Sequence, residues 1–332
     1  MGENRNYNYG IALLRMLMCF EVVVSHCWIG SVSIYSLPFY RLRGLAVPVF
    51  MFLSFYFSAK YFSTIDYTKT KKRIWRVVYP QIGWAIIYWI VLIILQIRMD
   101  ITFTDLLWQI VSGHSPKLNP SMWFQTVLIA LTFVFILIFS LIKIKKGLLI
   151  LFFLTLVSLF FQYSGYNLIL FDSLRYELKS PLGRFSEMIP YASLGYLVAH
   201  YNLFNRLKTK RKLCLITFGI ISLILSLYKL IPTAPGFGYS NNNNLLVVFF
   251  AAGFAYLLPF ERVSEKSRNI LKYVTRYTLG IYCMHRLVGE ILSMIRLELT
   301  GLIRCVIIYI IAFFISFIMC KLSSKYLKQL VE

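Results

Sequence analysis

The fold class is decided by residues 9 to 28, which read YGIALLRMLMCFEVVVSHCW. This run matches the ~20 apolar residues that an α-helix needs to cross a bilayer, yet it carries Arg15, Glu21 and His26. Ionisable side chains are energetically costly inside a membrane and normally face a bundle interior or a water-filled cavity. The default hypothesis is therefore that these three residues belong to a functional site. Eleven residues at about 100° each bring His26 to within about 20° of Arg15, roughly 16 Å further along the helix. One helix face therefore carries a cation and an imidazole. These two groups are either functional or polar residues that only pack against neighbouring helices and bond with them.

The composition extends this membrane character to the whole chain. Of the 332 residues, 59% are apolar and 14% are charged, which is too apolar for a soluble domain. We therefore expect residues 1–332 to form a single transmembrane domain. The net charge of +22 does not indicate nucleic-acid binding, because the basic residues lie between apolar segments and not on a solvated surface with exposed aromatic rings. The six cysteines show no Cys-x-x-Cys or Cys/His spacing, so no metal is expected.

Ten apolar runs have the length that a bilayer requires. Together they predict an all-α polytopic membrane protein, built as a bundle of about ten transmembrane helices. The runs are residues 9–28, 44–62, 78–97, 122–142, 147–163, 184–201, 213–231, 244–260, 277–296 and 303–321.

The basic residues predict the orientation of this bundle. Most of the 35 lysines and arginines flank one set of ends of the ten runs, and Lys and Arg are retained on the cytoplasmic side of a membrane. An even number of spans places both termini on one side. We therefore expect cytoplasmic N- and C-termini, with His26 near the outer end of the first span.

A basic segment, residues 69–80, precedes the third run and is expected to be an inner loop. It reads KTKKRIWRVVYP. Arg73 and Arg76 are three residues apart, so they point the same way on a helical turn, and paired guanidinium groups suit a polyphosphate. A basic inner loop is also what membrane topology requires, and for the loop's charge alone that interpretation is the stronger one.

Several motifs, in order along the chain, resemble those of the integral-membrane acyltransferase family 3. Leu14-Arg15 followed by His26 is similar to the signature of that family's first span. The other similar stretches are residues 47–54, 72–80, 122–124 and 279–285. Two positions depart from the family pattern, since Phe55 stands where a glycine is usual and Glu21 where an apolar residue is usual.

The resemblance implies an enzyme that moves an acyl group, usually acetyl, from cytoplasmic acyl-coenzyme A to a hydroxyl of an extracytoplasmic or lipid-linked polysaccharide. Arg73 and Arg76 would hold the phosphates of acetyl-coenzyme A, and Arg15 would meet this donor part-way through the bundle. His26, paired with Arg15 in catalysis, would act as a general base or as a transient acyl-imidazole relay, and the sequence leaves both open. The expected setting is a bacterial plasma membrane, with the acyl donor, a glycan acceptor and membrane lipid as partners and no nucleic acid.

Three further residues are candidates for binding the substrate. Trp123 is either a platform for a sugar or an anchor in the aromatic belt of the membrane interface. His285 is slightly more typical of a packing group than of a catalytic one. Glu21 lies about 120° from Arg15 around the helix, so we expect it to meet a cation on another segment. The arginines available for this pair are Arg184, Arg286 and Arg296.

The alternative function is a transporter or flippase of a polysaccharide intermediate, because buried charges and an even number of spans also describe carriers. Carriers built from repeats tend to show Gly- or Pro-interrupted spans in matching halves, and this sequence does not. A purely structural subunit would leave the Arg15 and His26 face without a purpose. The sequence therefore favours acyl transfer.

Overall fold

The structure, a computed structural model, describes residues 7–64, 67–164, 176–207, 209–227, 245–322 and 325–331. Within these ranges the chain forms helices joined by turns and contains no strand, which confirms the all-α class. Ten longer helices overlap the ten predicted runs, although α4 and α9 begin eight or more residues earlier than their runs. They are α1 (Tyr9–Cys27), α3 (Ala46–Thr64), α4 (Tyr67–Ile94), α6 (Trp123–Leu141), α7 (Ile144–Ser164), α9 (Tyr176–His200), α11 (Thr209–Leu227), α12 (Leu245–Leu257), α14 (Thr278–Met294) and α15 (Gly301–Leu322).

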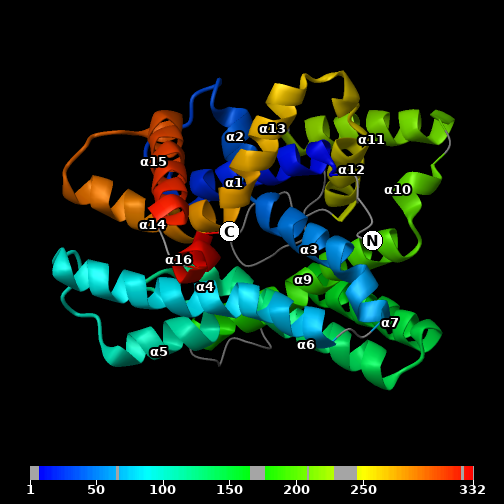
Figure 1. Cartoon of the computed structure of the whole chain (residues 1–332), viewed down its shortest axis with the longest axis horizontal. Coiled ribbons are helices and arrows are strands. Elements are labelled where there is room, and N and C mark those ends of the chain that lie inside the picture. The colour runs from blue at the N-terminus through cyan, green and yellow to red at the C-terminus, as the bar shows by residue number, and fades with distance from the viewer. Residues whose placement is uncertain are drawn as a thin grey trace.

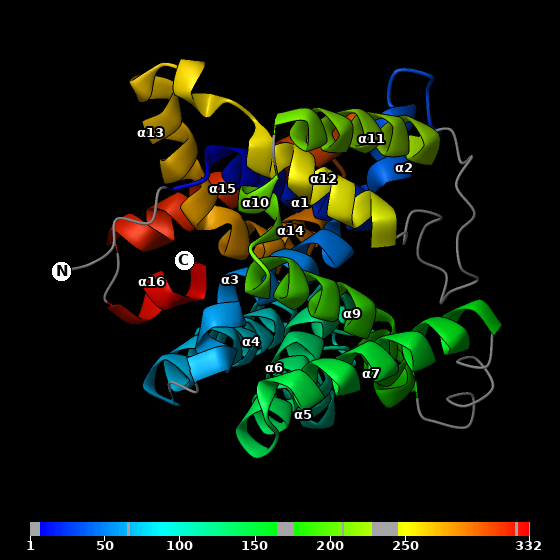
Figure 2. The same ribbon diagram turned by 90° about the vertical axis from the view of Figure 1, so that its right-hand side faces the viewer.

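Shorter helices connect or flank these ten. They are α2 (Leu37–Leu42), α5 (Phe103–Ser112), α10 (Leu203–Arg206), α13 (Glu265–Val274) and α16 (Lys325–Val331), with single 3-10 turns η1 (Pro120–Met122), η2 (Phe260–Arg262) and η3 (Thr275–Tyr277). In both views α4, α5, α6 and α7 form one side of the molecule, α1, α12, α13 and α15 form the other, and α3 lies between them (Figures 1 and 2).

Four helices of the described part of the chain are long and apolar enough to cross a membrane. These stretches are Tyr9–Cys27, Thr68–Ile94, Pro120–Leu141 and Gly301–Lys321. Two shorter apolar helices, Ala46–Phe62 and Leu245–Leu257, accompany them. The apolar helices make this a membrane protein, while the number of crossings and the side of the termini stay predictions.

The expected inner loop at residues 69–80 is wrong, because this segment is helical. It forms the first turns of α4, and Pro80 lies inside that helix. A proline removes one backbone hydrogen bond from a helix, and membrane helices tolerate this where neighbouring groups or water satisfy the freed carbonyl. The basic segment is therefore part of the helix itself, and its side chains have fixed directions.

Helix α1 packs on α14 and carries Arg15 and His26 on the side that faces α14. Arg15 donates a hydrogen bond to Thr278 Oγ1 over 3.1 Å at the start of α14. Further along both helices, the ring centroids of His26 and His285 are 5.4 Å apart. This confirms that Arg15 and His26 share one helix face.

Helices α3 and α9 approach at backbone contact distance where α9 has a glycine. A Cβ added to Gly195 would lie 2.1 Å from the carbonyl oxygen of Phe52, a clash that only a backbone shift can relieve. We therefore expect Gly195→Ala to lower the free energy of unfolding by about 1–3 kcal/mol, the range of overpacked cores. The measurement is the midpoint of thermal unfolding in detergent micelles.

Gly289→Ala is the matched control for this prediction. Gly289 is also buried in a helix, but its added Cβ would meet Cys27 Sγ at 3.4 Å, an ordinary contact. This variant should unfold at or slightly above the temperature of the parent, because alanine favours the helix over glycine. Equal stability of both variants would show that α3 and α9 are less closely packed than described.

Candidate active site

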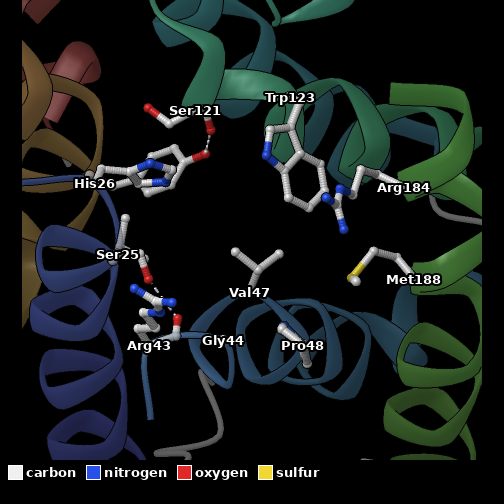
Figure 3. A pocket seen from close by; sticks show the side chains of 12 residues that line it. Ser25, His26, Arg43, Gly44, Val47, Pro48, Ser121, Trp123, Arg184 and Met188 are labelled. Atoms are coloured by element: carbon white, nitrogen blue, oxygen red, sulfur yellow. Dashed lines mark hydrogen bonds between the residues drawn. The ribbon is translucent and has the colours of Figure 1, made fainter. Parts of the chain in front are cut away.

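A pocket opens beside the last turn of α1, where His26 lies (Figure 3). Its residues come from α1, the segment before α3, α3 itself, η1, α6, α9 and α14. The polar lining consists of Ser25, His26, Arg43, Ser121, Trp123, Arg184 and Tyr282. Val47, Pro48 and Met188 are among the apolar residues of the wall.

The end of α1, and with it His26, is held by a buried arginine. A helix leaves its last carbonyl groups without partners inside the helix, and Arg304 Nε donates to the carbonyl oxygen of Cys27 over 3.1 Å. The same guanidinium donates to the carbonyl of Gly289 over 2.9 Å and to Ser293 Oγ over 2.8 Å, both on α14. Arg304 thus ties the ends of α1 and α14 to α15.

His285 lies next to His26 and is fully buried. Its Nδ1 is 2.6 Å from the carbonyl oxygen of Tyr282. A carbonyl oxygen only accepts hydrogen bonds, so Nδ1 carries the hydrogen and Nε2 of the neutral ring is the unprotonated nitrogen. Among the described residues, this Nε2 has no hydrogen-bond partner. The Tyr282 hydroxyl donates to the carbonyl of Ser121, which fastens α14 to η1 at the pocket wall (Figure 3).

Trp123 forms another wall of the same pocket. It is 4% exposed, and the guanidinium carbon of Arg184 lies 5.4 Å from the centroid of its ring. Arg184 is itself buried and pairs with Glu187 at 2.6 Å. A tryptophan that anchors a protein at the membrane interface is exposed to lipid, so the burial of Trp123 argues against the anchor interpretation.

Arg15 and Glu21 lie outside the pocket, although both are on α1 with His26. Arg15 is held by Thr278, nearer the start of the helix. Glu21 is 4% exposed and lies near Cys305 of α15. The ion pair expected for Glu21 is wrong for the described residues, where its Oε2 has no hydrogen-bond partner and no ion pair reaches it. Arg184, one of the three arginines expected as its partner, instead pairs with Glu187, which lies one turn along the same helix.

Arg73 and Arg76 occupy different environments, and their role in holding the phosphates of the donor stays a prediction. Arg73 is partly buried and donates to the carbonyl oxygen of Ser54 on α3 over 3.0 Å. Arg76 is exposed. Neither arginine lines the pocket that holds His26. Arg73 and Arg76 could therefore contact only those parts of a ligand that extend beyond this pocket.

The structure therefore brings His26, Trp123 and His285 together and leaves Arg15, Glu21, Arg73 and Arg76 elsewhere. The residues that the sequence reasoning missed are Ser25, Arg43, Ser121, Arg184 and Tyr282. One signal was available for two of them, because Arg43 and Arg184 each stand at the predicted outer end of an apolar run. In the described part of the chain, no group of three or more His, Cys, Asp or Glu residues could hold a metal ion.

The protein is an integral-membrane protein whose apolar helices surround two adjacent imidazoles and a buried tryptophan. Imidazole is a side chain that enzymes use for proton transfer and for covalent catalysis. A family model described as an acyltransferase domain matches residues 8–321, nearly the whole chain. The protein therefore belongs to acyltransferase family 3, and by this membership it is a membrane acyltransferase. No curated protein and no solved structure matched the chain.

Proposed function

We propose that the protein is a membrane O-acyltransferase, most readily an O-acetyltransferase, of extracytoplasmic or lipid-linked polysaccharide. Acetyl-coenzyme A would be the donor, and a hydroxyl of the glycan would be the acceptor. The observation that carries the proposal is that His26 and Trp123, from helices far apart in the sequence, line one pocket in a chain of the acyltransferase family.

His26 would perform the chemistry in one of two ways. As a general base, its imidazole takes the proton of the sugar hydroxyl while the hydroxyl oxygen attacks the thioester carbonyl. The carbon–sulfur bond then breaks, and the thiolate of coenzyme A leaves and takes up the proton. As a relay, the imidazole nitrogen attacks the thioester first, releases coenzyme A and passes the acyl group to the hydroxyl in a second step.

The neighbours of His26 support a role in proton transfer or acyl transfer. His285, whose ring is 5.4 Å away, is uncharged when Nδ1 alone carries its hydrogen, so it packs against His26 without electrostatic repulsion. The Trp123 ring supplies an apolar surface of the kind on which a sugar stacks. The space open to the centres of water molecules is about 30 Å³, room for roughly two waters, so we expect the helices around the pocket to separate when the substrates enter.

On the donor side we propose that Arg76, rather than the pair of Arg73 and Arg76, makes the main contact with the phosphates of coenzyme A. Arg76→Glu should weaken coenzyme A binding by about 10- to 100-fold, the equivalent of one lost charge-assisted hydrogen bond of about 1.5–3 kcal/mol. The thermal midpoint should not change, because Arg76 is exposed. Binding is measured by calorimetry on the purified full chain.

Lys71→Glu is the control for Arg76→Glu, since Lys71 is an exposed cation of the same segment. If both variants weaken coenzyme A binding equally, the effect comes from the overall charge of the segment and not from a specific contact of Arg76. Arg73→Glu should behave differently and lower the thermal midpoint, because it removes the hydrogen bond to the carbonyl of Ser54. If Arg76→Glu binds coenzyme A as tightly as the parent, the basic segment does not bind the donor and serves only to set the membrane topology.

We further propose that all ten long helices cross the membrane of a bacterial cell, with both termini in the cytoplasm. A cysteine in place of Tyr35, which is 88% exposed in the connection after α1, should react with a membrane-impermeant thiol reagent applied to intact cells. A cysteine in place of the exposed Lys145, at the start of α7, should react only after the membrane is opened by detergent. Both are made with Cys214 replaced by serine, because Cys214 is exposed. The reversed pattern would exchange the donor and acceptor sides.

The proposed activity is tested directly with labelled acetyl-coenzyme A. Purified protein in lipid vesicles, incubated with the donor and with cell-surface glycan from a strain lacking the protein, should move the label into the glycan. Movement of the glycan across the vesicle membrane without any transfer of label would instead support the transporter or flippase.

A further inference from the structure

The pocket beside His26 contains two arginines that the chemistry of acyl transfer does not require. Arg43 lies on the same side as Ser25 and His26, and Arg184 lies on the opposite side beside Trp123, with Val47 of α3 between them (Figure 3). Two guanidinium groups that line one partly buried pocket lose solvation and repel each other, unless an anion offsets their charge. An arginine of this pocket that has no carboxylate partner therefore calls for an anion.

The charge balance of the pocket is positive. Arg184 has a counter-ion, Glu187, at 2.6 Å. Among the ion pairs of the described residues, none includes Arg43, whose guanidinium carbon lies 3.8 Å from the ring centroid of Tyr40. One guanidinium charge thus remains beside the catalytic imidazole without a carboxylate.

Arg43 is held next to His26 by the backbone. Its carbonyl oxygen accepts a hydrogen bond of 2.7 Å from Ser25 Oγ, and Ser25 directly precedes His26 in α1. Its guanidinium carbon lies over the Tyr40 ring, and this cation–π contact restrains the guanidinium group. The cation is therefore presented at a defined place beside the reacting group and is not a mobile surface charge.

A guanidinium group in a partly apolar pocket binds oxyanions selectively. Its planar fork matches the two oxygens of a carboxylate or a phosphate, and such hydrogen bonds are about twice as strong as those between neutral groups. A neutral sugar hydroxyl would gain little from this arrangement. The phosphates of the donor are expected at the other end of the bundle, near Arg76, so the oxyanion belongs to the acceptor.

We propose that the acceptor is an anionic glycan, with a carboxylate or a phosphate close to the hydroxyl that is acylated, and that Arg43 binds this oxyanion with Arg184 across the pocket. The inference rests on the proposed function, because it identifies the substrate class of that same site. Arg43 would be a specificity-determining residue, and His26 would remain the catalytic one.

The test compares matched acids and neutral analogues and does not depend on catalysis. Binding of trigalacturonate and of its methyl ester to the full chain in detergent is measured by calorimetry, beside oligo(glycerol phosphate) and neutral oligoglycerol. The parent should bind at least one acid about 10-fold or more tightly than its neutral analogue, as expected for a charge-assisted contact. The two pairs of probes distinguish a carboxylate from a phosphate as the source of the oxyanion.

Arg43→Gln should remove this preference and leave the binding of acetyl-coenzyme A unchanged. Glutamine retains the backbone that accepts the hydrogen bond from Ser25, so the fold should persist. Arg296→Gln is the matched control, because Arg296 is an exposed arginine outside the pocket, and it should retain the preference. Arg184 is a poorer test, since removing it alone leaves Glu187 buried without its counter-ion.

Several outcomes would overturn the inference. Equal binding of acid and neutral probes by the parent would do so, and so would a preference that survives in Arg43→Gln. A loss of acetyl-coenzyme A affinity in Arg43→Gln would assign Arg43 to the donor. A lower kcat with unchanged affinity for the acid would assign it to the reacting carbonyl. If the parent transfers labelled acetyl to glycan but shows no preference for the acids, the proposed function stands and the inference fails. If the parent prefers the acids but transfers no acetyl, the proposed function fails while the anion-binding site stands.

Discussion

His26→Ala is expected to abolish acyl transfer while the protein remains inserted and binds coenzyme A. Loss of a general base should reduce the rate by about 10²- to 10⁴-fold, and loss of a nucleophilic relay would leave only background transfer. The substitution removes a polar group from a membrane helix and introduces a better helix former, so it should not impair insertion. The measurements are label incorporated into the glycan and calorimetric binding of coenzyme A.

His200→Ala is the matched control for this variant. His200 ends α9, stacks on Tyr196 and does not line the pocket, so its loss removes an imidazole without touching the site. Its rate should equal that of the parent. Transfer by His26→Ala at the rate of the parent would show that the pocket is not the place of the reaction.

Arg15→Ala separates catalysis from donor positioning. Arg15 is held by Thr278 away from the pocket, so if it meets the donor part-way, its removal should lower the affinity for coenzyme A together with the rate. His26→Ala should lower the rate alone. The contrast between the two variants tests whether the donor reaches His26 along the α1 face that carries both residues.

Arg304→Met is expected to have the second large effect, because it releases the end of α1. Methionine has a similar length but no donors, so the carbonyls of Cys27 and Gly289 would both lose a charged partner. Hydrogen bonds to charged groups contribute about 1.5–3 kcal/mol each, and we expect the free energy of unfolding to fall by about 3 kcal/mol or more on that basis. Both the thermal midpoint and the transfer rate should decrease.

The test of Arg304 must distinguish positioning of His26 from general loss of stability. The rate is therefore measured well below the thermal transition, where the variant is folded and binds coenzyme A. A lower kcat under these conditions supports positioning, and partial recovery in Arg304→Lys, which keeps one charged donor, would strengthen it. Arg211→Met, at an exposed arginine of α11, should change neither quantity. Unchanged kcat in Arg304→Met would make Arg304 a purely structural residue.

The sequence by itself determined the helices and the face of α1 that carries Arg15 and His26. Apolar runs of about 20 residues are a local property, and in a membrane they have almost no alternative to the helix because every backbone group must be bonded within its own segment. The helical period alone placed Arg15 and His26 on one face, and both do face α14. The inner loop expected at residues 69–80 was wrong for a related reason, since basic residues and a proline are only local signals and α4 runs through them.

Only the tertiary structure decided which side chains share the pocket. The period of a helix tells which residues lie on one face, but not which helix packs against that face. Arg43, Arg184 and Tyr282 join His26 through elements distant in the sequence, so no local spacing revealed them. The same limit explains why the ion pair expected for Glu21 was wrong. Packing between helices places the carbonyl of Ser54 beside Arg73. Arg184 instead pairs with Glu187, one turn along the same helix, which is a contact of the kind that local spacing predicts.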